Sequence, residues 1–200
     1  MYRFYLAAVD LLPGVLLLLP LYWILNKVYF CSARKSTLYC LFSCYIAVVY
    51  VLVGLPNVTY IRPEVNLNLI PVVGMIDDWK NCILNILLFV PLGAMLPVLW
   101  RKFRKLRYTV LLGFGMSLAI ELLQILTFRA TDVNDLITNT FGTYSGFLCA
   151  RLLLQKSTRL RCLVDEENTG EFVIVLTAVL LPMFFVYPFL SAALWDWVLS

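Results

Sequence analysis

Long apolar runs follow one another along this sequence and leave few folds open to it. The run LLPGVLLLLPLYWIL, residues 11–25, is one example. A helix needs about 20 mostly apolar residues to cross the hydrocarbon core of a bilayer. Only 14% of the residues are charged and 62% are hydrophobic, whereas soluble domains carry roughly a quarter of charged residues. The sequence therefore predicts an all-α fold, a polytopic membrane helix bundle.

Polar breaks between the apolar runs predict about six transmembrane helices. We expect them at residues 5–25, 37–55, 82–99, 108–127, 134–154 and 171–190. The first run resembles the apolar part of a signal peptide, but no small-residue cleavage site follows it. We therefore interpret it as a retained helix.

The basic residues are concentrated in every second connection. Twelve of the 16 lysines and arginines lie in residues 26–36, 101–107 and 151–170. Cytoplasmic loops carry this excess of positive charge, so both termini are predicted outside. The run RKFRKLR, residues 101–107, is then explained by topology without any nucleic acid, and it can contact anionic membrane lipids.

One polar stripe runs along the predicted fifth helix. Asp132, Asp135, Asn139, Gly142 and Gly146 are spaced by three, four, three and four residues, which places them on one face. Acidic residues are favoured at a helix N-terminus, and Asp132 fits the N-cap position. The glycines form a GxxxG pattern, which permits close approach of another helix.

Two neighbouring helices carry polar residues at the same expected end. The fourth helix has Ser117, Glu121 and Gln124 on one face, and the third helix has Asn85 near its start. At 1.5 Å per residue, Glu121 lies roughly 8 Å and Asn85 roughly 6 Å inside the outer surface. Arg129, between the fourth and fifth helices, is the expected counter-ion for Glu121, Asp132 or Asp135.

Two interpretations of these polar groups remain open. They could lock the helices together, because intramembrane hydrogen bonds contribute around 0.6–2 kcal/mol each. Alternatively, they could line an outward-facing polar pocket that binds a ligand at the membrane surface. Ionisable residues inside a span are costly and usually mark a functional site. We favour the pocket, because helix locking needs fewer charges than this cluster contains.

Four motifs in a fixed order resemble the VanZ-like family of bacterial membrane proteins. They are NLIP (68–71), NILLFVPLG (85–93), the pair Glu121 and Gln124 after SLAI, and RATDVNDLITNTFG (129–142). The resemblance implies a VanZ-like four-helix core at 37–154. An extra helix and a loop would lie on each side, at 1–36 and 155–200. It also implies a polytopic protein of the bacterial cytoplasmic membrane.

The family resemblance also suggests a role and a set of site residues. Name-giving relatives are associated with low-level resistance to teicoplanin and related glycopeptides, which act on cell-wall precursors outside the cell. The expected ligand is thus a glycopeptide antibiotic or a lipid-linked peptidoglycan precursor. The predicted ligand-binding residues all fall in or beside the matching motifs: Asn68, Asn85, Glu121, Gln124, Arg129, Asp132, Asp135 and Asn139.

A non-enzymatic binding protein is favoured over an enzyme, with no cofactor or metal expected. The chain has no histidine, which excludes Ser-His-Asp and Cys-His mechanisms. An enzyme acting on a lipid-linked substrate remains the alternative, with Glu121, Asp132 and Asp135 as candidate catalytic acids and bases. A transporter is disfavoured because the inner half of the predicted spans is nearly free of charge.

Overall fold

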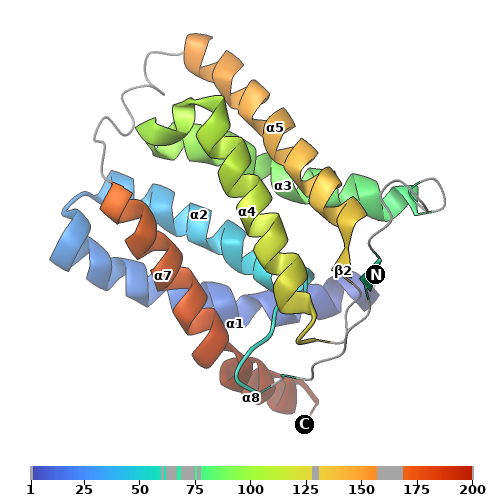
Figure 1. The fold of residues 1–200 in the computed structure, drawn as a ribbon. Helices are drawn as coiled ribbons and strands as arrows, with labels where there is room; N and C mark the ends of the chain where they lie inside the picture. The colour runs from blue at the N-terminus through green and yellow to red at the C-terminus, as the bar shows by residue number, and fades with distance from the viewer. Residues whose placement is uncertain are drawn as a thin grey trace. The chain divides into compact units, whose positions relative to one another are not determined.

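The computed structural model describes residues 2–59, 61, 67–68, 75, 78–127, 131–156 and 169–199 (Figure 1). Almost all of these residues are helical. The helices are α1 (Tyr2–Leu25), η1 (Asn26–Phe30), α2 (Ala33–Leu52), α3 (Trp79–Leu99), η2 (Arg101–Arg104), α4 (Leu106–Gln124), α5 (Val133–Lys156), α7 (Thr169–Phe185) and α8 (Tyr187–Leu199). Two short strands, β1 (Leu67–Asn68) and β2 (Thr131–Asp132), pair in parallel. The predicted all-α membrane helix bundle is confirmed.

Four of the described helical segments are long and apolar enough to cross a membrane. They are Val9–Phe30, Ala33–Leu52, Trp79–Leu99 and Leu106–Gln124. Each coincides with a predicted span to within a few residues. The segment Gly170–Phe185 and the helix Tyr187–Leu199 together qualify as a fifth, bent by 50° at the break. The placement of the termini outside stays a prediction.

The last predicted span, 171–190, falls on this bent pair, in which α7 ends at Phe185 and α8 begins at Tyr187. Pro188 explains the break, since proline has no N–H to donate to the carbonyl four residues earlier. That carbonyl belongs to Phe184, and it instead accepts a hydrogen bond of 3.2 Å from the backbone N–H of Val58. The chain therefore bends at Val186 without leaving this carbonyl unsatisfied.

The α5 helix differs in polarity from the four apolar segments. Its 24 residues would reach about 36 Å at 1.5 Å per residue, enough to cross a bilayer. However, asparagine, threonine and serine residues recur along it, so it does not meet the apolar criterion of the other spans. Several of these polar residues are buried, including Asn134, Thr138, Asn139 and Thr143. The polarity of α5 is therefore directed largely toward protein.

The chain divides into two compact units, which we call the terminal unit and the central unit. The terminal unit contains residues Met1–Ile61 and Gly170–Ser200, and the central unit contains Arg62–Thr169. The terminal unit thus holds α1, η1, α2 and almost all of the α7–α8 pair. The central unit holds α3, η2, α4, α5 and the strand pair. The division at 37 and 154 that the family resemblance implies rests on sequence similarity and stays a prediction.

Polar contacts between apolar helices stabilise the terminal unit. The Tyr22 hydroxyl on α1 lies 2.6 Å from the Ser43 hydroxyl on α2. Ser36 on α2 donates to the backbone oxygen of Tyr22 at 3.0 Å. On α8, the Trp195 indole N–H donates to the Asp10 carboxylate on α1 at 2.8 Å. These bonds hold α2 and α8 against α1.

In the central unit, α5 packs extensively along α3 through glycines (Figure 1). A Cβ atom on Gly142 or Gly146 would collide with the backbone oxygens of Ile86 and Val90 on α3. A Cβ on Gly93 of α3 would collide with the backbone oxygen of Thr143 on α5. The predicted close approach at the GxxxG pattern is confirmed, and α3 is the partner helix.

Candidate functional site

The polar residues of α4 lie on one buried face, as the helical spacing predicts. Ser117 is 0%, Glu121 is 3% and Gln124 is 6% exposed. Between them, Ile120 is also buried, whereas the neighbouring Leu118 and Leu122 are exposed. An α-helix of this kind directs its polar face into the bundle, because polar groups facing lipid are costly. The α4 stripe therefore points into the protein.

Glu121 connects α4 to the start of α5. Its carboxylate oxygen Oε2 accepts a hydrogen bond of 2.9 Å from the backbone N–H of Asp132. The Asp132 carboxylate in turn accepts from the backbone N–H of Asn134 at 2.8 Å. This second bond caps the first turn of α5, as predicted for Asp132. The two carboxylates thus satisfy donors at the beginning of the helix.

Asn68 reaches the same place through the backbone. Strand β1 pairs with β2 in parallel, and the register sets Asn68 opposite Asp132. The long connection after α2 is thereby attached to the entrance of α5. Nothing in the sequence pattern predicted this strand pair, because two residues are too few to show strand periodicity.

Two further hydrogen bonds join α5 to both of its neighbours. The Asn85 side-chain amide on α3 donates to the Asp135 carboxylate at 2.7 Å. One turn deeper along α5, the Asn139 amide donates to the Ser117 hydroxyl on α4 at 3.0 Å. Asn139 is 4% exposed, and its carbonyl oxygen Oδ1 accepts no hydrogen bond from any described residue. Side chains of three helices therefore meet at one end of the central unit.

The structure places seven of the eight predicted site residues. We call six of them the polar cluster: Asn85, Glu121, Gln124, Asp132, Asp135 and Asn139. Asn68 joins it by its backbone pairing with Asp132. Arg129, the predicted counter-ion, lies outside the described residues. Whether these residues bind a ligand stays a prediction.

Carboxylate and amide groups make up the chemistry of the polar cluster, with the Ser117 hydroxyl beside Asn139. Ionised carboxylates only accept hydrogen bonds, whereas the asparagine and glutamine amides both donate and accept. The cluster can thus bind a ligand rich in N–H and O–H donors. Across the part of the chain that the structure describes, no group of three or more aspartate, glutamate or cysteine side chains is arranged to hold a metal ion.

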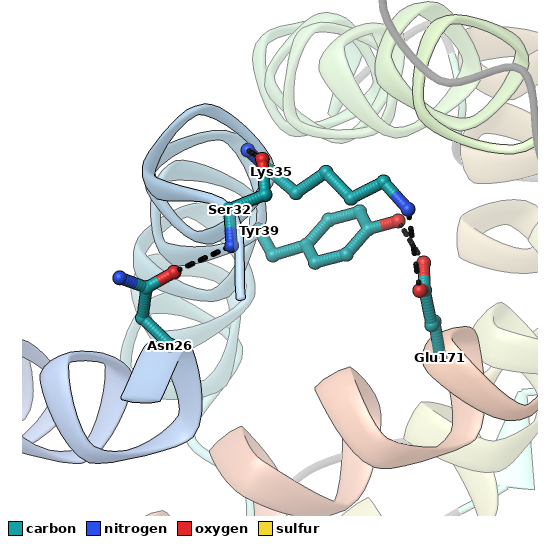
Figure 2. A network of polar contacts seen from close by, with 5 residues as sticks. All are labelled: Asn26, Ser32, Lys35, Tyr39 and Glu171. Atoms are coloured by element: carbon teal, nitrogen blue, oxygen red, sulfur yellow. Dashed lines mark hydrogen bonds and ion pairs between the residues drawn. The ribbon is translucent and has the colours of Figure 1, made fainter. Parts of the chain in front are cut away.

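A buried carboxylate in the terminal unit was missing from the sequence-based predictions. Glu171 on the first turn of α7 is 5% exposed. The Tyr39 hydroxyl on α2 donates to its Oε2 at 2.6 Å, and the Lys35 ammonium lies 3.5 Å from its Oε1. Figure 2 shows both side chains extending from α2 toward Glu171. This contact ties α7 to α2.

The same corner is ordered by the turn between η1 and α2. The Asn26 side-chain oxygen accepts from the backbone N–H of Ser32 at 3.1 Å (Figure 2). Ser32 then caps α2 by accepting from the backbone N–H of Lys35. A glutamate at the start of a very apolar helix was a signal for a buried partner. In the sequence it follows the acidic residues 165–167 and is the first residue of the predicted span 171–190, but it was not singled out as a polar group with a partner.

These features define a class: a multi-pass helical membrane protein whose central helices bury a cluster of carboxylate and amide side chains. Comparison with known proteins gives the family. The chain belongs to the VanZ/LLP1 family, whose profile matches residues 38–154. The match begins in α2 of the terminal unit and ends near the end of α5 in the central unit.

Part of the chain is also similar to a curated protein. The chain is 33% identical over 84 residues to Protein VanZ of Enterococcus faecium. The alignment covers 40% of the chain and 50% of the relative, so the chain spans about half the length of the curated relative that it matches. No solved structure matches the chain.

Proposed function

We propose that the polar cluster is an outward-facing binding pocket that contributes to glycopeptide resistance of the teicoplanin type. Its ligand would be the drug or the lipid-linked cell-wall precursor that the drug targets. The observation that carries this proposal is the convergence of Glu121, Asp132 and Asp135 with the amides of Asn85 and Asn139. Membership of the VanZ/LLP1 family and the likeness to Protein VanZ support it.

The distribution of charge in the central unit supports an outward orientation in the bacterial cytoplasmic membrane. The acidic groups lie where α3 and α5 begin and where α4 ends. Arg101, Lys102, Arg104 and Lys105 lie beyond the opposite end of α3. The positive-inside rule assigns the basic end to the cytoplasm. The polar cluster would then face the compartment in which glycopeptides meet cell-wall precursors.

The chemistry of the polar cluster suits both proposed ligands. Glycopeptides and peptidoglycan precursors present peptide N–H groups and sugar hydroxyls, which donate hydrogen bonds. Carboxylates accept such bonds, and bonds to an ionised acceptor are roughly twice as strong as neutral ones. Because water is scarce near the hydrocarbon core, few water molecules compete with the ligand for these hydrogen-bond acceptors. A ligand that is partly embedded in the membrane could reach the cluster directly.

Equilibrium binding of teicoplanin and of lipid II to the purified chain tests the pocket. We expect Asp135→Asn and Glu121→Gln to weaken binding about tenfold or more, because each removes a charged acceptor worth about 1.5–3 kcal/mol. Asp78→Asn is the matched control, because it removes the same negative charge at an exposed position. The Asp78 carboxylate accepts a hydrogen bond from the Asn81 side chain. Equal binding by all four proteins would contradict the proposal.

Susceptibility of a glycopeptide-sensitive Gram-positive host tests the resistance phenotype separately. Cells expressing the wild-type chain should tolerate more teicoplanin than cells carrying an empty vector. Cells expressing Glu121→Gln or Asp135→Asn should not, while Asp78→Asn should protect like wild type. Glu171→Gln controls for a buried carboxylate lost outside the cluster. Unchanged susceptibility in every strain would remove the antibiotic role for this chain.

A membrane enzyme acting on a lipid-linked substrate is the alternative. The observation in its favour is that Glu121 and Asp132 share one hydrogen-bonded path at the start of α5, with Asp135 one turn further. Carboxyl groups whose surroundings differ can divide the roles of acid and base between them. Turnover of lipid II by the wild-type chain, lost in Asp135→Asn protein that still folds, would favour the enzyme over the binding protein.

A further inference from the structure

A second site lies at the opposite end of the central unit from the polar cluster. A cavity of about 310 Å³ is lined by Pro97, Arg104, Phe147, Arg151, Leu154 and Gln155. Its volume is at the lower end of the range typical of small-ligand pockets, about 300–1,000 Å³. None of the residues in the polar cluster contributes to it. The cavity therefore needs an explanation of its own.

Helical spacing and one turn of the chain build this cavity. Phe147, Arg151 and Leu154 lie at positions i, i+4 and i+7 of α5, and so they share one face. Pro97 lies in the last turn of α3. Beyond α3 the chain turns back through η2, and the Arg104 Nε–H donates to the Pro97 backbone oxygen at 3.3 Å. This bond holds the Arg104 guanidinium beside the α5 face.

The lining combines positive charge with an apolar floor. Pro97, Phe147 and Leu154 are buried, Arg104 is half-buried, and Arg151 and Gln155 are exposed. None of these six lining residues is acidic. Two guanidinium groups with several N–H donors each match a phosphate in charge and geometry. The buried side chains beside them offer contact to hydrocarbon instead of water.

We propose that this cavity binds an anionic phospholipid of the cytoplasmic leaflet. The phosphate would lie between Arg104 and Arg151, and the start of an acyl chain would cover Phe147 and Leu154. Basic pockets between membrane helices on the cytoplasmic side are known to take such head groups. The basic segment 101–107 surrounds the entrance with further positive charge, which attracts anionic lipid over a range of about one Debye length.

Lipid titrations into the full-length, detergent-solubilised chain test this site by native mass spectrometry. The probes are phosphatidylglycerol, phosphatidylcholine with the same acyl chains, and inorganic phosphate. We expect phosphatidylglycerol to bind the wild-type chain more tightly than phosphatidylcholine. Arg151→Gln should weaken phosphatidylglycerol binding about fivefold, the usual effect of one basic residue at an anionic surface. Arg104→Gln with Arg151→Gln should weaken it about 25-fold.

Arg107→Gln is the matched control, because Arg107 belongs to the same basic segment but is exposed and contacts Tyr108 instead of the cavity. It should bind phosphatidylglycerol like wild type. An equal loss of phosphatidylglycerol binding in Arg107→Gln would overturn the proposed site, because it would show that the whole basic segment attracts the lipid without a defined pocket. Equal binding of phosphatidylcholine, or displacement of phosphatidylglycerol by inorganic phosphate, would also overturn it. Because Arg151 is exposed, its single variant keeps the test valid if the double variant misfolds.

Discussion

Buried polar side chains are the feature that sets this chain apart at the scale of single residues. Glu121 is buried against the backbone of Asp132, and Asn139 is buried against Ser117. A polar group in an apolar surrounding is costly unless it is hydrogen-bonded. The bonds of the polar cluster thus stabilise the helix packing, and the same groups supply the proposed ligand contacts. A structural role and a binding role are therefore not exclusive here.

The contact between Asn85 and Asp135 should be measurable as a coupling energy. We expect Asn85→Ala and Asp135→Ala each to lower the free energy of unfolding. The double variant should lose less than the sum of the two by about 0.6–1.7 kcal/mol, the range found for hydrogen bonds between membrane helices. Unfolding by SDS titration in mixed micelles measures this. Strictly additive losses would show that the two side chains do not interact.

At the scale of secondary-structure elements, glycine determines which helices pack closely. Gly93, Gly142 and Gly146 leave room for the backbones of α3 and α5 to touch. This contact aligns Asn85 with Asp135, because both residues lie near the N-terminal ends of these helices. It also brings the end of α3 beside Arg151 at the opposite cavity. The glycine contact therefore positions both proposed sites.

A single added methyl group should disturb this packing. In Gly146→Ala, the new Cβ would collide with the backbone oxygen of Val90, which is unable to rotate away. We expect a loss of about 1–3 kcal/mol in the free energy of unfolding, as for other overpacked positions. Gly115→Ala on α4 is the control, since its Cβ would meet nothing within 4 Å.

The control variant should gain stability, because alanine is favoured over glycine in a helix by roughly 0.5–1 kcal/mol. Unfolding of both variants is compared in the same micelles. Equal stability of Gly146→Ala and Gly115→Ala would contradict the close contact between α3 and α5.

At the scale of the whole molecule, charge separates the two ends of the central unit. Carboxylates gather at one end, and lysines and arginines gather at the other. The positive-inside rule orients a membrane protein by its lysines and arginines, and it assigns their end to the cytoplasm. The proposed drug or precursor pocket and the proposed lipid site would then lie on opposite sides of one bilayer. Each site would have its own compartment and its own ligands.

Labelling from one side of the membrane should reveal this orientation. Asp78→Cys and Lys105→Cys are introduced separately into a chain in which the six native cysteines are replaced. In intact cells, a maleimide that does not cross membranes should label position 78 and spare position 105. Both should be labelled after the cells are lysed. Labelling of position 105 in intact cells would reverse the topology and place the polar cluster in the cytoplasm.

The positions of the helices and the inward faces of α4 and α5 could be predicted from the sequence. Both depend on local spacing, because an apolar run shows a span and a period of 3.6 residues shows a face. Ser117, Glu121 and Gln124 were assigned to one buried face in this way. Gly142 and Gly146 likewise indicated a close helix contact, without showing which helix would make it.

Which residues contact one another was decided only by the tertiary structure. Glu171 meets Tyr39 across 132 residues of sequence, and no local pattern links the two. The pairing of β1 with β2, and the hydrogen bond from Val58 to the Phe184 carbonyl at the bend, also join segments that are distant in the chain. A periodic pattern reports that a side chain is buried, because burial follows from its own helix. Which group it meets there depends on how separate helices pack.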